Sequence, residues 1–290
     1  MSEINITIDN EEIQVEEGAT ILDAAKDLGI DVPTLCYHPD LTIHGACRVC
    51  VVEDTESGEL LASCCTPVQD GMEINTRSAK ARKARRRNVK LLLANHPNDC
   101  LGCDRNGSCE LQDITYSLGI NSEDMEELKG ETRDNKIDDT GPSLKRDPNK
   151  CILCGRCVRV CEEVQGVSAL QFSGRGFDTV VQTAFDLPQS EINCANCGQC
   201  ATVCPVGAIT EISEIDKVWN AIEDKDKHVI VQTAPAIQAT IGEEFGFEAG
   251  TVVTGKLVAA LRKIGFDKVF STEFTADLTI MEEGNELLKR

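Results

Sequence analysis

The sequence predicts a multi-domain α+β protein, a row of small units rather than one large core. At 290 residues the chain is long enough for two or three domains. Near its start, isoleucines alternate with polar residues as in a half-buried strand, and its last third alternates strand and helix patterns. Fifteen of the sixteen cysteines fall, together with one histidine, into four groups of regular spacing.

The composition narrows the class of protein. The net charge of −20 disfavours nucleic acid and anionic membranes as partners. No apolar run reaches the roughly 18 residues that cross a bilayer, and the first residues lack the basic and apolar regions of a secretory signal. A disulfide framework is typical of short secreted chains. We therefore expect free or metal-bound thiols in a reducing cytoplasm.

Residues 1–76 are expected to form a β-rich unit. Isoleucines alternating over 4–8 predict a strand, followed by a return partner. Thr20 can cap a helix over 21–28. Three further strands are expected, at residues 49–53, 60–63 and 72–75.

Charged runs, chain breaks and a repeated motif predict the boundaries of the segments that follow residue 76. Residues 77–121 begin with eight basic residues, which we interpret as a solvated helix face rather than a nucleic-acid patch. Residues 122–147 are polar and acidic, with a Gly-Pro break, and are expected to be a linker or a wrapping loop. Residues 148–212 carry C-x2-C-G-x-C-x3-C twice, offset by 43 residues. Residues 213–290 predict an α/β segment, with strands at 228–233 and 268–270 and helices at 254–264 and 274–289.

The first cysteine group comprises Cys36, Cys47, Cys50 and either Cys64 or Cys65. Its spacing is similar to that of a plant-type [2Fe–2S] ferredoxin loop, although the first gap is longer than in that pattern. Neighbouring residues of a strand point to opposite faces, so only one of the two adjacent cysteines can face a cluster. A zinc site with the same four thiolates is the alternative.

The second group contains one histidine with three cysteines. A [4Fe–4S] cluster needs four ligands, and no spare cysteine lies near this triplet, so the histidine is expected to be the fourth. A neutral imidazole in place of a thiolate makes the cluster less negative and should raise its potential. The other histidines have no matching triplet. The expected ligands are His96, Cys100, Cys103 and Cys109.

The third and fourth groups have the spacing of two-cluster bacterial ferredoxins, in which the fourth cysteine of each run ligates the other cluster. Glycines at 155 and 198 allow the tight turn within each run. One predicted [4Fe–4S] site therefore uses Cys151, Cys154, Cys157 and Cys204, and the other uses Cys161, Cys194, Cys197 and Cys200.

Six short motifs carry a family resemblance, three around the first cysteine group and three within residues 213–290. They are residues 35–39 (LCYHP), 45–50 (GACRVC) and 62–64 (ASC), then 232–236 (QTAPA), 251–256 (TVVTGK) and 279–284 (TIMEEG). The chain resembles the N-terminal electron relay of multi-cluster, NAD-linked [FeFe]-hydrogenases over essentially its whole length. The large iron–sulfur subunit of NADH dehydrogenase and related formate dehydrogenases share the first two sites.

The resemblance implies a fold for each segment. Residues 1–76 would be a β-grasp [2Fe–2S] ferredoxin-like domain with Cys64 as fourth ligand, and 77–121 a small helical [4Fe–4S] domain. Residues 148–212 would be a two-cluster ferredoxin-like domain, and 213–290 the start of a hydrogenase-like α/β domain. The cofactors implied are one [2Fe–2S] and three [4Fe–4S] clusters.

The sequence departs from the hydrogenases in one respect, because no cysteine follows Cys204. Residues 205–290 therefore offer no thiolate for an active-site cluster. The tail also predicts a sheet with unpaired edges. We expect either the front part of a longer polypeptide, which we favour, or a partner that completes the sheet.

The expected function is electron relay between an external carrier and a hydrogenase active site outside these residues. The carrier would be ferredoxin or a flavin-containing, NADH-oxidising subunit, within a hetero-oligomeric complex. The alternative is a naturally short, non-catalytic iron–sulfur subunit of an NAD-linked or formate-linked oxidoreductase. An iron–sulfur or zinc regulatory protein is a third interpretation, but no sensing element is recognisable.

Overall fold

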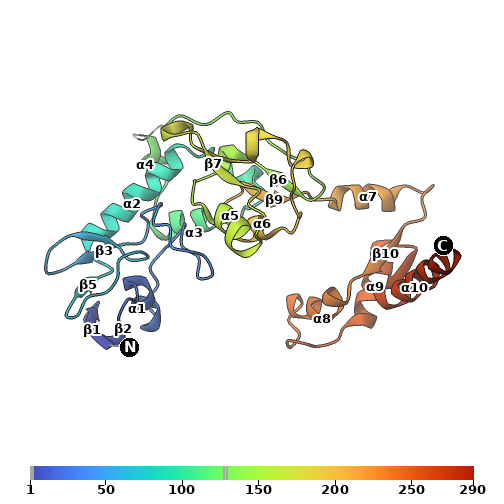
Figure 1. Cartoon of the computed structure of the whole chain (residues 1–290), viewed down its shortest axis with the longest axis horizontal. Helices are drawn as coiled ribbons and strands as arrows, with labels where there is room; N and C mark the ends of the chain where they lie inside the picture. Colours follow the sequence, from blue (N-terminus) through green and yellow to red (C-terminus); the bar gives the residue numbers. More distant parts are fainter. Residues whose placement is uncertain (1–2, 127, 129) are drawn as a thin grey trace. The chain divides into compact units, whose positions relative to one another are not determined.

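The computed structural model describes residues 3–126, 128 and 130–290. The chain divides into two compact units, Met1–Ile212 and Ser213–Arg290, each with mixed α/β structure (Figure 1). None of the helices in the described residues is long and apolar enough to span a membrane.

The first unit begins with a five-stranded sheet. Strands β1 and β2 form an antiparallel hairpin, β1 pairs in parallel with β5, and β3 pairs antiparallel with both β5 and β4. The strand predicted over 4–8 is confirmed, as are the three later strands within two residues. The order is β2 (Glu11–Glu16), β1 (Glu3–Ile8), β5 (Glu73–Asn75), β3 (Val51–Asp54) and β4 (Leu60–Ala62).

Helix α1 (Ile21–Asp27) packs against this sheet. Thr20 caps it as predicted: its hydroxyl accepts from the Asp23 amide, and the Asp23 carboxylate accepts from the Thr20 amide. The buried side of the helix shares a core with Ile6, Ile8 and Val52 of the strands. Apolar burial therefore orients the sheet and the loops that follow it.

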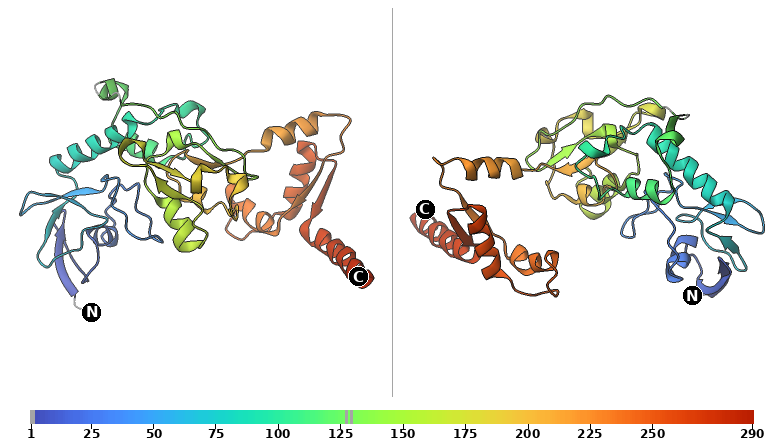
Figure 2. Two further views of the ribbon diagram at one scale, coloured as in Figure 1. Left: turned by 45° about the horizontal axis from the view of Figure 1, so that its top comes forward. Right: turned by 180° about the vertical axis from the view of Figure 1, so that it is seen from behind.

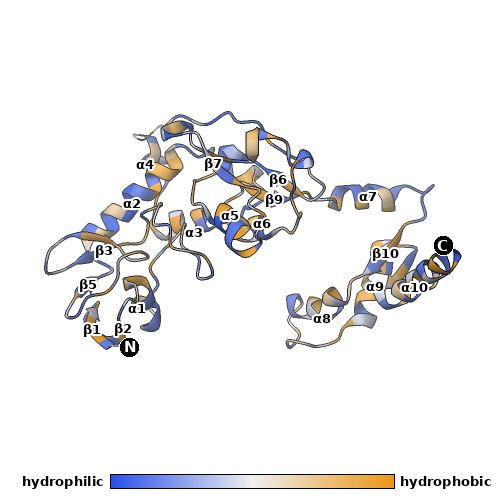
Figure 3. Ribbon diagram, in the orientation of Figure 1, coloured by the Kyte–Doolittle hydropathy of each residue, from blue (hydrophilic) through white to orange (hydrophobic). Residues whose placement is uncertain are grey.

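A long helix, α2 (Ala79–Ala94), connects the first two cysteine groups. Its first turns are hydrophilic and its last turn hydrophobic (Figure 3). The expectation of a solvated basic face holds for part of it, whereas Arg85 is buried and donates to the Val51 carbonyl at 2.8 Å. Three short helices follow: η1 (Cys100–Gly102), α3 (Glu110–Ser117) and α4 (Ser122–Glu126).

Among the described residues, the duplicated region contains two antiparallel pairs of short strands and seven short helices. Strand β6 (Leu144–Arg146) pairs antiparallel with β9 (Ile209–Glu211), and β7 (Gln171–Ser173) with β8 (Val180–Gln182) (Figure 2). Strand β6 lies within residues 122–147, where the sequence analysis expects a linker or wrapping loop. The helices are η2 (Pro148–Lys150), α5 (Arg156–Arg159), the π-helix η3 (Val160–Val164), η4 (Gly176–Asp178), η5 (Ala184–Asp186), η6 (Gln189–Glu191) and α6 (Gln199–Thr202).

A second buried core, separate from the one between the sheet and α1, joins the first cysteine loop to α2, α3 and the duplicated region. It includes Leu35 and Val49 from the first cysteine loop, Leu111 from α3, and Cys157 and Val206 from the duplicated region. Each of these side chains is at most 7% exposed. Packing in this core therefore connects the first cysteine loop, α3 and the duplicated region.

The second unit contains a parallel pair of strands, β10 (Ile230–Thr233) and β11 (Lys268–Ser271). Both strands and both of the predicted helices are confirmed, and the helix predicted over 254–264 has the same bounds in the structure. The helices are α7 (Ile215–Glu223), α8 (Pro235–Glu244), α9 (Thr254–Ile264) and α10 (Thr272–Lys289).

Candidate iron–sulfur sites

The four thiols expected at site one lie in contact with one another. Cys50 Sγ is 3.3 Å from Cys64 Sγ, and the Cys47 amide donates to Cys36 Sγ at 3.5 Å. The Cys36 thiol is also hydrogen-bonded to the thiols of Cys47 and Cys64. Cys36, Cys50 and Cys64 are almost fully buried. Residues from 36 to 64 are thus brought to one point between the loop and the ends of β3 and β4.

The adjacent Cys65 points elsewhere. Its thiol donates to the Ala62 carbonyl at 3.6 Å and lies 3.2 Å from where a side chain on Gly45 would begin. Gly45 has a left-handed φ of 66°, so a glycine is required there for both space and conformation. The structure therefore groups Cys64, and not Cys65, with the other three thiols.

The protein around site one does not allow all four thiols to lose their protons together. Hydrogen bonds from Cys47 and Cys64 lower the pKa of Cys36, and the Cys64 thiol lowers that of Cys50 to about 6. The same contacts, with Cys36 as the first partner, raise the pKa of Cys47 and of Cys64. Two thiols thus keep their protons unless a positive centre replaces them, which is the property of a metal-binding thiol set.

Site two surrounds a cavity of about 390 Å³ lined by His96, Cys100 and Cys109. The His96 Nε2 atom is buried without a hydrogen-bond partner, while Nδ1 accepts a long hydrogen bond of 3.3 Å from the Asn98 amide. Burial lowers the pKa of His96, which keeps the imidazole neutral and able to act as a ligand. Cys103 does not line this cavity, and its Sγ lies 2.6 Å from where a side chain on Gly207 would begin.

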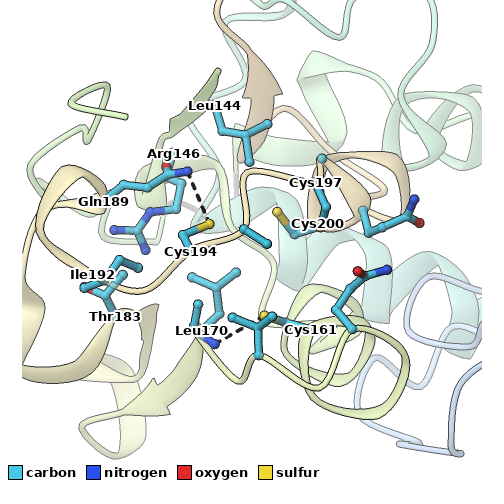
Figure 4. A pocket seen from close by; sticks show the side chains of 16 residues that line it. Leu144, Arg146, Cys161, Leu170, Thr183, Gln189, Ile192, Cys194, Cys197 and Cys200 are labelled. Carbon is cyan, nitrogen blue, oxygen red and sulfur yellow. Dashed lines mark hydrogen bonds between the residues drawn. The ribbon is translucent and has the colours of Figure 1, made fainter. Parts of the chain in front are cut away.

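Sites three and four are two apolar hollows, and each is lined by cysteines from both runs. Cys204 lines the first hollow with the three leading cysteines of the third run. Cys161 lines the second with the three leading cysteines of the fourth run (Figure 4). The structure thus places together the crossed sets Cys151, Cys154, Cys157, Cys204 and Cys161, Cys194, Cys197, Cys200.

The two runs share one backbone geometry. Leu153 and Asn196, at matching positions, have left-handed φ values of 56° and 52°. Each donates its amide, at 3.4 Å, to the sulfur of the first cysteine of its run. Gly155 and Gly198 follow with φ values of 71° and 79°, as the glycines in the sequence predicted. The left-handed Leu153 was not predicted, because leucine rarely adopts this conformation.

Burial raises the pKa of five thiols of sites three and four. Desolvation raises the pKa of Cys151 and Cys200 to about 11 and that of Cys154 to about 12. It also raises the pKa of Cys157 and Cys204. These thiols remain protonated at neutral pH unless a cation compensates their charge. The donor set therefore fits metal clusters rather than free thiolates.

The sites contact one another through arginines that the sequence analysis missed. Arg105 of site two donates to the Cys204 carbonyl at 3.1 Å. Arg159 of α5 donates to the Cys36 carbonyl at 2.6 Å. Comparing the two copies of the duplicated run could have identified Arg156 and Arg159, because the second copy has the uncharged residues Gln199 and Thr202 at the matching positions.

Among the described residues, no group of three or more histidine, cysteine or acidic side chains is arranged to hold a single metal ion.

Four family descriptions match successive segments of the chain. Residues 1–79 match the "2Fe-2S iron-sulfur cluster binding domain", and residues 85–124 the "NADH-ubiquinone oxidoreductase-G iron-sulfur binding region". Residues 141–210 match the "NADH-quinone oxidoreductase subunit 3, ferredoxin-like domain". Residues 227–290 match the "Iron only hydrogenase large subunit, C-terminal domain". The chain therefore contains segments of both 2Fe-2S and 4Fe-4S binding type.

Three relatives define the comparison further. The "NADP-reducing hydrogenase subunit HndD" of Solidesulfovibrio fructosivorans is 48% identical over 100% of this chain and 50% of its own length. The "NADH-ubiquinone oxidoreductase 75 kDa subunit" of Reclinomonas americana is 42% identical over 71% of this chain and 29% of its own length. The chain thus spans half or less of these two relatives. A chain of the solved "NAD+-reducing [NiFe]-hydrogenase in the H2-reduced state" is 34% identical, with a TM-score of 0.67, over 73% of this chain and 88% of its own length.

The mixed α/β fold, the four cysteine sites and these matches define an iron–sulfur electron-transfer region. More particularly, the chain belongs to the family of relay regions that [FeFe]-hydrogenase subunits share with the large iron–sulfur subunit of NADH dehydrogenase. The resemblance expected from the sequence motifs is confirmed.

Proposed function

We propose that this chain holds one [2Fe–2S] cluster and three [4Fe–4S] clusters and relays electrons through them. Bound clusters supply one-electron storage and transfer, and the chain binds, buries and spaces them. The proposed ligands are Cys36, Cys47, Cys50 and Cys64 for the [2Fe–2S] cluster; His96, Cys100, Cys103 and Cys109; Cys151, Cys154, Cys157 and Cys204; and Cys161, Cys194, Cys197 and Cys200 for the three [4Fe–4S] clusters.

The observation that carries the proposal is the crossing of the two cysteine runs. Cys204 lines the hollow of the third run and Cys161 that of the fourth. Two sites that exchange a ligand are necessarily neighbours, which suits electron transfer between them. Backbone amides that donate to Cys151 and Cys194 would stabilise a reduced, more negative centre.

Contacts between site two and the duplicated region support a connected relay. The Cys109 thiol donates to the Pro205 carbonyl at 3.6 Å, and the Cys103 sulfur packs against Gly207. Both partners lie within three residues of Cys204. These contacts support electron exchange between site two and site three.

In finer detail, we propose a β-grasp ferredoxin-like domain, a small helical domain, a two-cluster ferredoxin-like domain and part of a hydrogenase-type domain. We infer that electrons pass between ferredoxin, or a flavin-containing NADH-oxidising subunit, and a hydrogenase active site outside these residues. Sites one and two would receive electrons separately and pass them to site three. The match of residues 227–290 to a hydrogenase segment supports this destination.

Metal analysis and spectroscopy test the proposal. Anaerobically purified protein should contain about 14 iron and about 14 acid-labile sulfide per chain, as expected for these four clusters. Reduction with dithionite should produce paramagnetic signals of both cluster types. A zinc-rich, iron-poor preparation without such signals would refute the relay.

The second candidate is a non-catalytic iron–sulfur subunit of an NAD-linked or formate-linked oxidoreductase. It is favoured by the similarity to a [NiFe]-hydrogenase chain, 88% of which is covered. The two candidates differ in their stable partners. Native mass spectrometry of the anaerobic complex would distinguish a subunit continuous with a hydrogenase domain from one bound to a separate catalytic subunit.

A further inference from the structure

Two arginines of α5 are buried where the cysteine sites approach one another. Arg156 and Arg159 are 5% and 8% exposed, although arginine is rarely buried in proteins. Both lie within the third cysteine run, and the fourth run has Gln199 and Thr202 at the matching positions. The two copies therefore share their cysteines, but only the third run has positively charged side chains at these two positions.

The Arg159 guanidinium bridges site one and site three. It donates to the Cys36 carbonyl at 2.6 Å, to the Thr42 carbonyl, and to the Cys154 carbonyl at 3.5 Å. Its Nε donates to the Gly155 carbonyl at 3.3 Å. One rigid group thus contacts a cysteine of each site and the loop between Cys36 and Cys47.

The two arginines differ in how their charge is compensated. Arg156 forms a bidentate ion pair with Glu110, at 2.6 and 3.0 Å. Arg159 forms no ion pair among the described residues, and its hydrogen bonds go to carbonyl groups. Its charge acts more weakly on the Glu163 carboxylate, whose pKa is lowered by hydrogen bonds from Thr42 and, to a smaller extent, by Arg159. A buried cation without a paired anion is costly unless negative charge lies nearby. With clusters bound, the ligand thiolates proposed for sites one and three would add such charge on either side.

We propose that Arg159 is a positioning residue that raises the reduction potential of the site-one cluster and holds its loop against site three. A positive charge beside a centre that becomes more negative on reduction stabilises the reduced form. The hydrogen bonds to Cys36 and Cys154 fix the distance between the two ligand-bearing segments. This inference rests on the proposed ligand sets of the two sites.

A redox titration of the whole anaerobic protein, followed by EPR, tests the proposal. Arg159→Gln removes the charge, and we expect the equilibrium constant for reducing the [2Fe–2S] cluster to fall tenfold, which is about 59 mV for one electron. Arg159→Lys keeps the charge and should remain within threefold of the native protein. Arg175→Gln, an exposed arginine with no side-chain partner among the described residues, is the matched control and should cause no change.

The outcomes separate this inference from the proposed function. A native protein without a [2Fe–2S] signal would refute the proposed function. With all clusters present, a decrease of less than threefold in Arg159→Gln, or an equal decrease in Arg159→Lys, would overturn the role of the charge. Selective loss of the [2Fe–2S] signal in Arg159→Gln would support the proposal that Arg159 holds the site-one loop against site three. Loss of every cluster signal in both Arg159 variants would overturn that proposal, because it would indicate a general folding role.

Discussion

Replacing Asp138 with asparagine should destabilise the first unit next to site four. The Asp138 carboxylate accepts hydrogen bonds from the Arg146 guanidinium at 2.7 Å and the Thr140 hydroxyl at 2.7 Å. It also accepts one from the backbone amide of Gln189 at 3.0 Å. Asp138 and Arg146 are both 8% exposed. Burial raises the pKa of Asp138, but Arg146 and Thr140 outweigh it and lower the pKa to about 2. The ion pair is therefore fully charged at neutral pH.

The magnitude follows from leaving Arg146 buried without its anion. Removing one partner of a buried ion pair costs about 3–5 kcal/mol, and asparagine retains one acceptor, so we expect about 3 kcal/mol. The effect should reach site four, because the Gln189 side chain also contacts Cys194 Sγ at 3.8 Å. Cluster absorption should therefore be lost at a lower denaturant concentration.

Urea unfolding of the anaerobic protein at neutral pH, followed by circular dichroism and visible absorption, measures the change. The matched control is Asp139→Asn, since Asp139 is the exposed neighbour, and exposed substitutions usually change stability by about 0.5 kcal/mol or less. Equal unfolding midpoints for the two variants would refute the reasoning that Asp138 compensates a buried charge.

Three further predictions concern the ligands. Cys204→Ser should remove the same EPR signal that Cys151→Ser removes, although the two cysteines belong to different runs; loss of different signals would contradict the crossing. His96→Cys should keep the [4Fe–4S] cluster of site two but lower its reduction potential, because a thiolate adds negative charge. An unchanged potential in a redox titration would exclude His96 as a ligand. Cys64→Ser should abolish the [2Fe–2S] absorption and Cys65→Ser should preserve it, and the reverse result would exchange the two assignments.

The elements that sequence reasoning predicted correctly are those whose signals are local. The cap at Thr20 depends on a side chain three residues away, and α9 on a helical spacing within its own eleven residues. Strand β6 was missed because it follows a polar, acidic stretch with a Gly-Pro break, and its partner β9 lies far along the chain. The left-handed Leu153 was missed because its conformation is set by the run around it rather than by leucine itself.

The sequence by itself determined the spacing of the cysteines within each run, on which the proposed ligand sets rest, because residues two or three positions apart are brought together by the local backbone. It also determined the family, since the motifs around the cysteines are contiguous. Only the tertiary structure decided which distant groups meet. It turns Cys64 and not Cys65 toward the other thiols of site one, and it brings Arg159 to the carbonyl of Cys36, 123 positions away. Such contacts depend on the packing of distant segments around separate buried cores, which no local pattern in the sequence encodes.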